Sequence, residues 1–232
     1  MEKNLVLDLD HTLIHTQDDN RDFKKLKLYS DSKNAHLRKK TYNLNLVDVE
    51  PSPPGSGDVM QLTGAVRPYL KEFRDFIFKN FNRIIVWSAG RGKYVRRLCE
   101  ILFPGENFPY DVLTYDDCDI DEGNQVFKPL QKIFDKYPEM NEKNTLLIDD
   151  RLETIEDNKD NGIMIPPFHT KLKKEDLEDN NDVCLLKLMS WFSLKEFKNC
   201  SDVRELYKDD IFRRTISEYS NLVKREKEEN EN

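Results

Sequence analysis

The chain has 232 residues, of which 38% are hydrophobic, 10% aromatic and 35% charged, and its formal net charge is −7 at pH 7. This length suits one domain with a modest insertion, and the aromatic content argues against a largely disordered chain. The negative charge argues against a broad nucleic-acid-binding surface, so we expect no direct binding to nucleic acid. The chain starts with charged residues and has no long apolar run, so we expect no signal peptide and no membrane segment. We therefore expect an intracellular protein of the nucleus or cytoplasm.

Neither the cysteines nor the histidines show the spacing of a metal site. The spacing of His15, His36 and His169 is not that of metal ligands. The cysteines form no Cys-x-x-Cys pair, so we expect free thiols rather than a zinc site or a disulfide framework. The four cysteines are Cys99, Cys118, Cys184 and Cys200.

Strand and helix patterns alternate along the chain. Apolar residues recur at helical spacing over residues 70–81 and 95–102, and a third helical pattern covers 129–137. The alternation indicates an α/β fold with a Rossmann-like parallel sheet that helices cover on both faces. The buried strands that the apolar runs predict lie at residues 4–9, 83–88, 145–149 and 162–165.

Two insertions interrupt this alternation. Residues 17–62 follow the first strand and are expected to form a flap that includes a hairpin, because two strand-like runs flank the loop "PSPPGSG". Residues 115–125, "YDDCDIDEGNQ", form a short acidic insertion. We expect an α/β core over residues 1–182 and a helical extension over 183–232 that packs on this core.

Polar residues collect where the predicted strands end. Ligands of an open parallel sheet bind outside the carboxyl ends of its strands, so these residues should meet in one crevice. A lysine that precedes the helix leading into the third strand can reach the same place. The residues are Asp8, Asp10, Ser88, Asp149, Asp150 and Lys128.

The carboxylates suit phosphoryl transfer with Mg²⁺. Asp8, Asp150 and the backbone carbonyl of Asp10 offer the oxygen ligands that Mg²⁺ prefers, and the ion offsets the repulsion between the acidic groups. Asp8 is the candidate nucleophile, which would form an aspartyl-phosphate. Asp10 is the candidate general acid and base, which protonates the leaving oxygen and then activates water.

Three further positions suit phosphate binding. The hydroxyl of Ser88 and the backbone amide of Ala89, near the start of a helix, can donate to phosphate oxygens. Lys128 supplies a point charge that offsets the phosphate and the aspartates.

Residues around these groups have supporting roles or none. We expect Thr12 to donate a hydrogen bond to Asp8, and Arg67 either to anchor the start of a helix or to brace the carboxylates. Asp149 either caps the following turn or orients Lys128. A general-base role for His11 is disfavoured, because Asp10 already fills it and adjacent side chains along a strand point to opposite sides.

These residues and the strings around them resemble a known family. "DLDHT" at residues 8–12 resembles the first motif of the haloacid dehalogenase-like phosphatases, and Ser88, Lys128 and Asp150 fall where later motifs are expected. "LVLDLDHTLIHT", "VRPYLKEF", "VWSAGRGKYV" and "LLIDDR" resemble one branch of that superfamily, the carboxy-terminal-domain (CTD) phosphatases and their NLI-interacting-factor-like relatives.

The resemblance implies a Mg²⁺-dependent phosphatase that lacks a large cap domain. It implies an accessible site and a phosphoprotein or phosphopeptide substrate, with phosphoserine or phosphothreonine as the target. In the best-known members the substrate is the heptad-repeat tail of RNA polymerase II. The family's peptide-contacting insertion between the second and third motifs is here short and acidic, which weakens the case for that particular substrate.

Two other functions remain open on the sequence. One is a phosphatase of the same superfamily that acts on a small molecule or on a nucleic-acid 3′-phosphate. The other is a catalytically silent adaptor that binds phosphoproteins. The oligomeric state is not indicated by the sequence.

Overall fold

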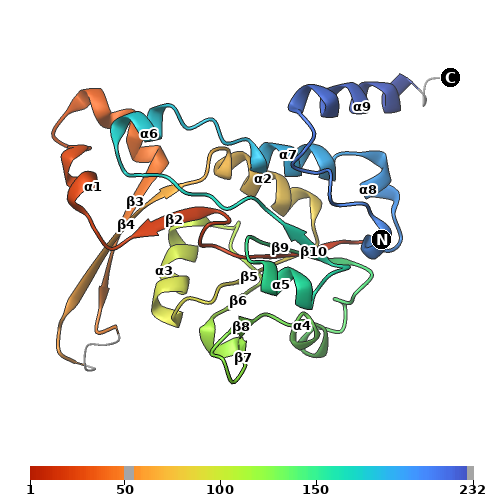
Figure 1. The fold of residues 1–232 in the computed structure, drawn as a ribbon, viewed down its shortest axis with the longest axis horizontal. Coiled ribbons are helices and arrows are strands. Elements are labelled where there is room, and N and C mark those ends of the chain that lie inside the picture. Colours follow the sequence, from red (N-terminus) through yellow and green to blue (C-terminus); the bar gives the residue numbers. More distant parts are fainter. Residues whose placement is uncertain (50–54, 229–232) are drawn as a thin grey trace.

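A five-stranded parallel sheet forms the centre of the molecule (Figure 1). The computed structural model describes residues 1–49 and 55–228. The parallel sheet confirms the α/β fold class expected from the alternation of strands and helices. The strands, in their order across the sheet, are β10 (Gly162–Met164), β9 (Thr145–Asp149), β1 (Asn4–Leu7), β5 (Arg83–Trp87) and β6 (Asp111–Leu113).

Each face of the sheet contributes to its own hydrophobic core. In β1, Leu5 and Leu7 belong to one core cluster and Val6 belongs to the other, as the alternation of side chains along a strand requires. Helices therefore cover both faces. The first cluster includes residues of α2 (Leu70–Asn80), α3 (Gly92–Leu102) and α7 (Cys184–Phe192), and the second includes residues next to and within α4 (Gln131–Lys136).

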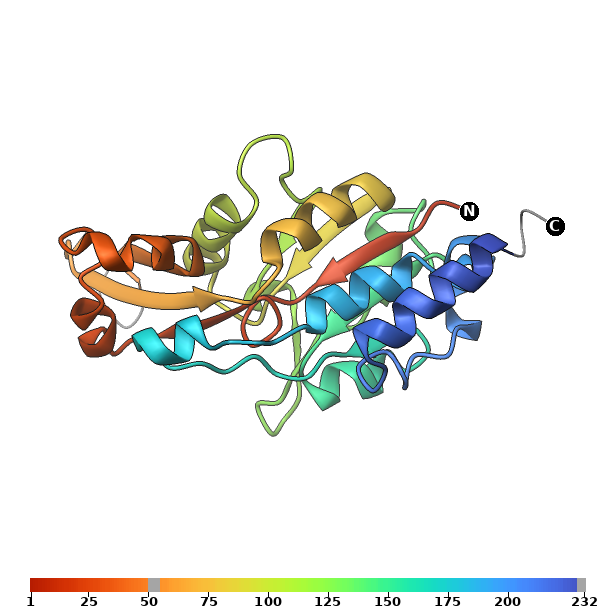
Figure 2. The ribbon, with the colours of Figure 1, turned by 90° about the horizontal axis from the view of Figure 1, so that it is seen from above.

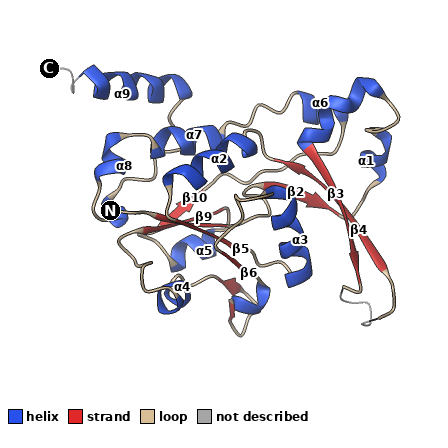
Figure 3. Ribbon diagram, turned by 180° about the vertical axis from the view of Figure 1, so that it is seen from behind, coloured by secondary structure: helices blue, strands red, loops and turns tan. Residues whose placement is uncertain are grey.

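A second, antiparallel sheet lies beside the carboxyl ends of the central strands (Figure 3). Its middle strand β4 pairs with β3 on one side and with β2 on the other. The hairpin loop between β3 and β4 lies partly outside the described residues. The elements of this region are β2 (Ile14–Gln17), α1 (Arg21–Lys25), the 3₁₀ helix η1 (Ser32–Lys40), β3 (Thr41–Val47) and β4 (Val59–Val66).

The acidic segment at residues 115–125 makes a small hairpin at the edge of the molecule. β7 pairs antiparallel with β8, so that Asp119 lies opposite Phe127. A helix, α5 (Leu152–Asp157), follows β9 and connects it to β10. The acidic segment contains the 3₁₀ helix η2 (Tyr115–Asp117) and β7 (Asp119–Ile120), and β8 (Val126–Phe127) follows it directly.

The C-terminal segment packs on the core through aromatic side chains. The ring of Phe192 in α7 lies 5.0 Å from the ring of Phe81, which follows α2, and 4.9 Å from that of Phe197 in α8. Helices α7 and α9 lie side by side (Figure 2). No helix among residues 1–49 and 55–228 is both long enough and apolar enough to cross a bilayer. The remaining elements are α6 (Lys174–Glu178), α8 (Lys195–Asn199), the 3₁₀ helix η3 (Val203–Glu205) and α9 (Ile216–Glu228).

Candidate active site

The register of the central sheet brings two aspartates to one edge. Leu7 in β1 pairs with Val86 in β5 and with Ile148 in β9, so the residues that follow these three positions leave the sheet together. The backbone amide of Asp8 donates to the carbonyl of Ile148 at 3.0 Å, which holds Asp8 next to Asp149. The backbone thus places the two carboxylates side by side.

Lys128 lies between these two carboxylates. Its Nζ is 2.5 Å from Oδ1 of Asp8 and 2.6 Å from Oδ2 of Asp149, and all three side chains are buried. Burial by itself lowers the pKa of Lys128, but the attraction of Asp8 and Asp149 outweighs it, and the pKa lies above its usual range. The lysine therefore stays charged, and it neutralises one of the two carboxylates.

The second negative charge has no matching cation in this group. Burial raises the pKa of Asp8 to about 8, and the repulsion of Asp149 and Asp10 adds to the effect, while Lys128 opposes it. The pKa of the half-buried Asp150 is raised as well, mainly by burial and to a smaller extent by repulsion from Asp149, while His11 has the opposite effect. The site as a whole therefore favours an additional positive charge.

The oxygen atoms at this edge fit a divalent cation. One carboxylate oxygen from each of Asp8, Asp149 and Asp150 lies within 4.8 Å of the other two. Such hard oxygen donors suit Mg²⁺, which takes few protein ligands and keeps several waters. Asp8 and Asp150 are two of the ligands predicted from the sequence. The third, Asp10, was expected to contribute its backbone carbonyl.

The carboxylate of Asp10 faces the second sheet and α3. Its Oδ1 accepts hydrogen bonds from the hydroxyl of Thr16 at 2.9 Å and from that of Tyr94 at 2.6 Å. The hydroxyl of Tyr42 lies 2.6 Å from that of Thr16 and completes the network. We did not predict these three hydroxyl residues. Thr16 and Tyr94 lie in the strings "LIHT" and "GKYV" and Tyr42 lies in "TYNLNLV", and no spacing in these strings points to Asp10.

Ser88 and Ala89 lie at the carboxyl end of β5, as expected. The Oγ of the buried Ser88 accepts a hydrogen bond from the amide of Gly90 at 3.1 Å, so the hydroxyl hydrogen can be donated elsewhere. A Cβ atom at Gly90 would lie 2.8 Å from the ring of Tyr94 and 3.2 Å from Oγ of Ser88. The lack of a side chain at residue 90 is therefore what allows α3 to begin so close to the site.

Thr12 makes no hydrogen bond to Asp8. The predicted hydrogen bond between them is not formed, and the buried Oγ1 of Thr12 has no partner among the residues that the structure describes. The chain turns sharply after Asp10, with amides of the turn donating to the carbonyl of Leu9, so Thr12 no longer follows the alternation of the strand. That change of direction was not visible in the sequence.

Arg67 is an anchor of the backbone rather than a brace of the catalytic carboxylates. Its fully buried guanidinium binds both oxygens of Asp182, at 3.1 and 2.8 Å. It also donates to the carbonyl of Thr12 at 2.9 Å and to that of Pro166 at 2.7 Å. Arg67 therefore ties three segments together behind the site, which favours the first of its two expected roles, an anchor near the start of α2, over a brace of the aspartates.

Asp149 performs both of the roles that the sequence left open. Its Oδ2 accepts from Lys128, and its Oδ1 accepts from the backbone amide of Arg151 at 2.8 Å. The same carboxylate thus orients the lysine and caps the turn that precedes α5.

The chain is similar to known phosphatases over most of its length. A family model described as NLI interacting factor-like phosphatase matches residues 3–204. Ubiquitin-like domain-containing CTD phosphatase 1 of Xenopus tropicalis is 32% identical over 149 residues, which are 61% of this chain and 45% of the relative. CTD small phosphatase-like protein 3 of Caenorhabditis elegans is 29% identical over 191 residues, 82% of this chain and 53% of the relative. The chain thus spans about half the length of these curated relatives.

Two solved structures share the fold. Fcp1, described as an essential RNA polymerase II CTD phosphatase, matches with a TM-score of 0.56 and 23% identity, over 73% of this chain and 43% of that one. A fission yeast Fcp1 variant bound to beryllium fluoride matches with a TM-score of 0.56 and 21% identity, over 82% of this chain and 49% of that one. The family model and the shared fold together confirm the resemblance seen in the motifs. The chain belongs to the family of NLI-interacting-factor-like phosphatases.

Proposed function

We propose that this chain is a Mg²⁺-dependent phosphatase that dephosphorylates phosphoserine or phosphothreonine in a protein or peptide through an aspartyl-phosphate at Asp8. The observation that carries the proposal is the buried group of Asp8, Lys128 and Asp149, with Asp150 beside it. Burying clustered charges is costly, and a cluster with an uncompensated carboxylate is typical of a functional site.

In the first half of the reaction, the carboxylate of Asp8 attacks phosphorus, and the bond from phosphorus to the serine or threonine oxygen breaks. Asp10 donates a proton to that leaving oxygen, so the product is a neutral hydroxyl. The hydroxyls of Thr16 and Tyr94 hold the carboxyl group of Asp10 in place for this transfer. The hydroxyl of Ser88 and the amide of Ala89 donate to the phosphoryl oxygens.

In the second half, Asp10 takes a proton from water, and the resulting nucleophile attacks phosphorus. The bond between phosphorus and the Asp8 oxygen breaks, which releases phosphate and restores the carboxylate. Lys128 stays charged throughout and offsets negative charge on Asp8 and Asp149. When bound by Asp8, Asp150 and the Asp10 carbonyl, Mg²⁺ supplies further positive charge that stabilises the transferring group.

The relatives favour a protein substrate over a small molecule. Both curated relatives and both solved structures described above are named as phosphatases of the CTD type. Asp10 and Asp150 are only half-buried, which suits a site that reaches a side chain on another polypeptide. The hairpin over residues 115–125 is acidic, so a substrate with basic residues near the phosphorylated one fits this edge best.

Rates on a substrate panel test the proposal. We compare turnover rates in Mg²⁺ on three substrate classes, namely phosphoserine and phosphothreonine peptides, sugar phosphates and 3′-phosphorylated oligonucleotides. Asp8→Asn is the inactive variant and Asp75→Asn is the matched control. Asp75 is a surface residue of α2 that pairs with Lys71. We expect turnover of phosphopeptides to exceed that of the other classes and to vanish only in Asp8→Asn. Faster turnover of sugar phosphates or oligonucleotides would contradict the substrate class, and phosphopeptide binding without any turnover would favour an adaptor.

A further inference from the structure

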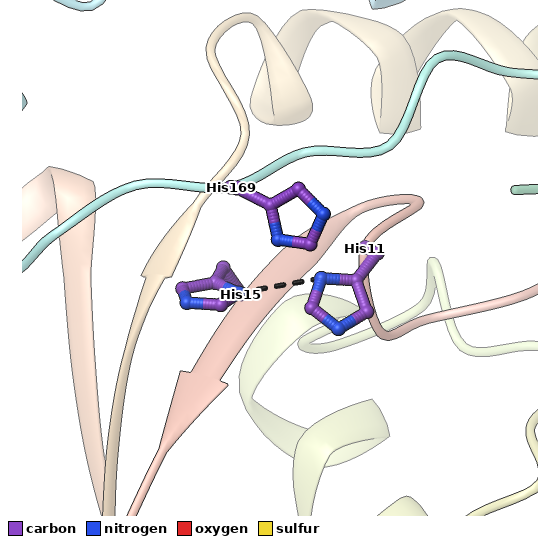
Figure 4. Close-up of side chains that lie close together, drawn as sticks. All are labelled: His11, His15 and His169. Atoms are coloured by element: carbon purple, nitrogen blue, oxygen red, sulfur yellow. Dashed lines mark hydrogen bonds between the residues drawn. The ribbon is translucent and has the colours of Figure 1, made fainter. Parts of the chain in front are cut away.

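Three of the four histidines of the chain gather at one place (Figure 4). His11 lies in the turn after β1, His15 lies in β2, and His169 follows β10. The ring centroids of His11 and His15 are 5.1 Å apart, those of His11 and His169 are 4.4 Å apart, and those of His15 and His169 are 5.5 Å apart. The spacing of the histidines in the sequence did not indicate this group, because the fold brings His15 and His169 together from distant parts of the chain.

Backbone hydrogen bonds hold these segments in place. The amide of His11 donates to the carbonyl of Ile14 at 2.7 Å, and the carbonyl of His11 accepts from the amide of Phe168 at 2.7 Å. His15 pairs with Ala65 in the antiparallel sheet. His11 also has a φ of 61°, in the left-handed region that residues with a side chain rarely adopt. Strained backbone of this kind is found preferentially at binding and catalytic sites.

The ring nitrogens face one another at a distance that suits two ligands of one ion. The Nδ1 atoms of His11 and His15 are 3.3 Å apart, and one nitrogen from each of the three rings lies within 4.8 Å of the others. Two nitrogens that bind the same Zn²⁺ at about 2.0–2.1 Å with tetrahedral angles lie roughly 3.3 Å apart. The His11–His15 pair therefore already has the spacing of two ligands of one ion, and a nitrogen of His169 lies within 4.8 Å of both.

Polar groups around the rings can fix their orientation. Nδ1 of His11 lies 3.3 Å from the carbonyl of Phe168, and Nε2 of His15 lies 3.1 Å from the side-chain amide of Gln17, which also donates to the carbonyl of Thr170. These contacts orient the rings in the metal-free protein. An ion at the two Nδ1 atoms requires the ring protons to lie on Nε2, so the contact between His11 and Phe168 is exchanged for the ion when it binds. Burial, together with the neighbouring His11 and His169, lowers the pKa of His15.

We propose that His11, His15 and His169 form a binding site for Zn²⁺ that is distinct from the carboxylate site. Imidazole nitrogens suit Zn²⁺, whereas Mg²⁺ prefers carboxylate oxygens such as those of Asp8 and Asp150. Three protein ligands leave a fourth position of the ion open to water or to another ligand. A pocket of about 430 Å³, lined by His15, His169 and Lys171 among others, adjoins two of the three histidines.

Binding measurements on untagged protein test the proposal, because a polyhistidine tag would bind the same ions. Metal-free protein is titrated calorimetrically with Zn²⁺ in the presence of excess Mg²⁺, and Co²⁺ is used as a spectroscopic probe of tetrahedral nitrogen ligands. His169→Ala removes an exposed ligand with little risk to folding, and thermal unfolding verifies that the variant is folded. His36→Ala is the matched control, since His36 pairs with Glu178 on the surface and is the remaining histidine of the chain.

We expect the wild-type protein and His36→Ala to bind one Zn²⁺ and to give the absorption bands of tetrahedral Co²⁺. We expect His169→Ala to bind at least about tenfold more weakly, since even the partners of metal ligands contribute about that much to affinity. Asp8→Asn and Asp150→Asn should bind Zn²⁺ as the wild type does. Equal binding by His169→Ala and the wild type, loss of binding in His36→Ala, or loss of binding in the aspartate variants would overturn the proposal.

Discussion

Lys128 and Asp8 form a buried ion pair, with Nζ of the lysine 2.5 Å from Oδ1 of the aspartate. The side chain of the lysine is 1% exposed and that of the aspartate 7%. Lys128 binds Asp149 as well, at 2.6 Å, so one cation serves two carboxylates. In such a dry environment the removal of one partner leaves charges that neither water nor protein compensates.

Replacement of Lys128 by methionine should therefore destabilise the protein strongly. The change keeps the apolar stem but leaves Asp8 and Asp149 without their shared cation, so that Asp149 is buried unpaired, and we expect the free energy of unfolding to fall by about 3–5 kcal/mol. Urea unfolding in the absence of metal measures the effect. The matched control is Lys132→Met in the neighbouring helix α4, where the lysine is 43% exposed and pairs with Asp119. We expect this control to change the free energy by about 0.5 kcal/mol or less. A similar loss in both variants would show that the buried pair has no special role.

The raised pKa of Asp8 makes the stability of metal-free protein depend on pH. Burial raises this pKa from 3.8 to about 8, so the folded state binds a proton more tightly than the unfolded state does. The stability that this proton provides is fully present below a pH of about 4 and is lost as the pH rises to about 8. With a chelator present, the melting temperature of the wild type should therefore fall over this range relative to that of Asp8→Asn, which cannot ionise. Excess Mg²⁺ should reduce the fall, because it compensates the ionised carboxylate.

A pH-independent difference in melting temperature between wild type and Asp8→Asn would contradict this explanation. The comparison is informative because both proteins share every other titratable group. A general loss of stability at high pH would affect the two proteins equally.

The hydroxyl groups around Asp10 should matter for turnover. Tyr94→Phe removes the donor that lies 2.6 Å from Oδ1 of Asp10, so that the carboxyl group is held only by Thr16. Because proton transfer requires a fixed geometry, we expect kcat to fall about tenfold with little change in KM. The matched control is Tyr42→Phe, since Tyr42 contacts Thr16 rather than Asp10. An effect of Tyr42→Phe on kcat as large as that of Tyr94→Phe would show that the network acts on the fold and not on Asp10.

Gly64 should not tolerate even a methyl group. A Cβ atom at this residue of β4 would collide with the ring of Tyr42 and would lie 2.6 Å from the backbone carbonyl of His15. We expect Gly64→Ala to lower the free energy of unfolding by about 1–3 kcal/mol, as overpacking usually does. Gly92→Ala is the control, because its Cβ would lie 3.9 Å from the nearest atom and alanine favours the helix that begins there. Unfolding in urea compares the two, and a loss in Gly92→Ala equal to that in Gly64→Ala would contradict the steric reason.

The central sheet was largely predictable because its strands are runs of buried residues. The run "RIIVW" at β5 and the run "TLLID" at β9 are apolar on both faces, as strands of a covered parallel sheet must be. The edge strand β6 was not predicted, because Asp111–Leu113 is too short to show a pattern. The gathering of polar residues at one place could be predicted from the sheet, since the carboxyl ends of parallel strands share one edge.

Contacts between distant segments could not be predicted in the same way. The hydroxyl of Tyr94 reaches Asp10 only because α3 begins immediately after Gly90. His169 meets His11 only because the segment after β10 crosses the turn that follows β1, where the amide of Phe168 donates to His11. Helical or strand periodicity carries no information about such crossings.

The account rests on Asp8 as the group that accepts the phosphoryl group. The most direct measurement is an acid quench of the enzyme during turnover of a phosphopeptide in Mg²⁺, followed by mass spectrometry of the proteolytic fragment that contains residues 8 and 10. We expect a phosphoryl adduct on Asp8 in the wild type, more of it in Asp10→Asn, where water activation is impaired, and none in Asp8→Asn, which should also be inactive. Turnover by Asp8→Asn at the wild-type rate, or an adduct on another residue, would contradict the account.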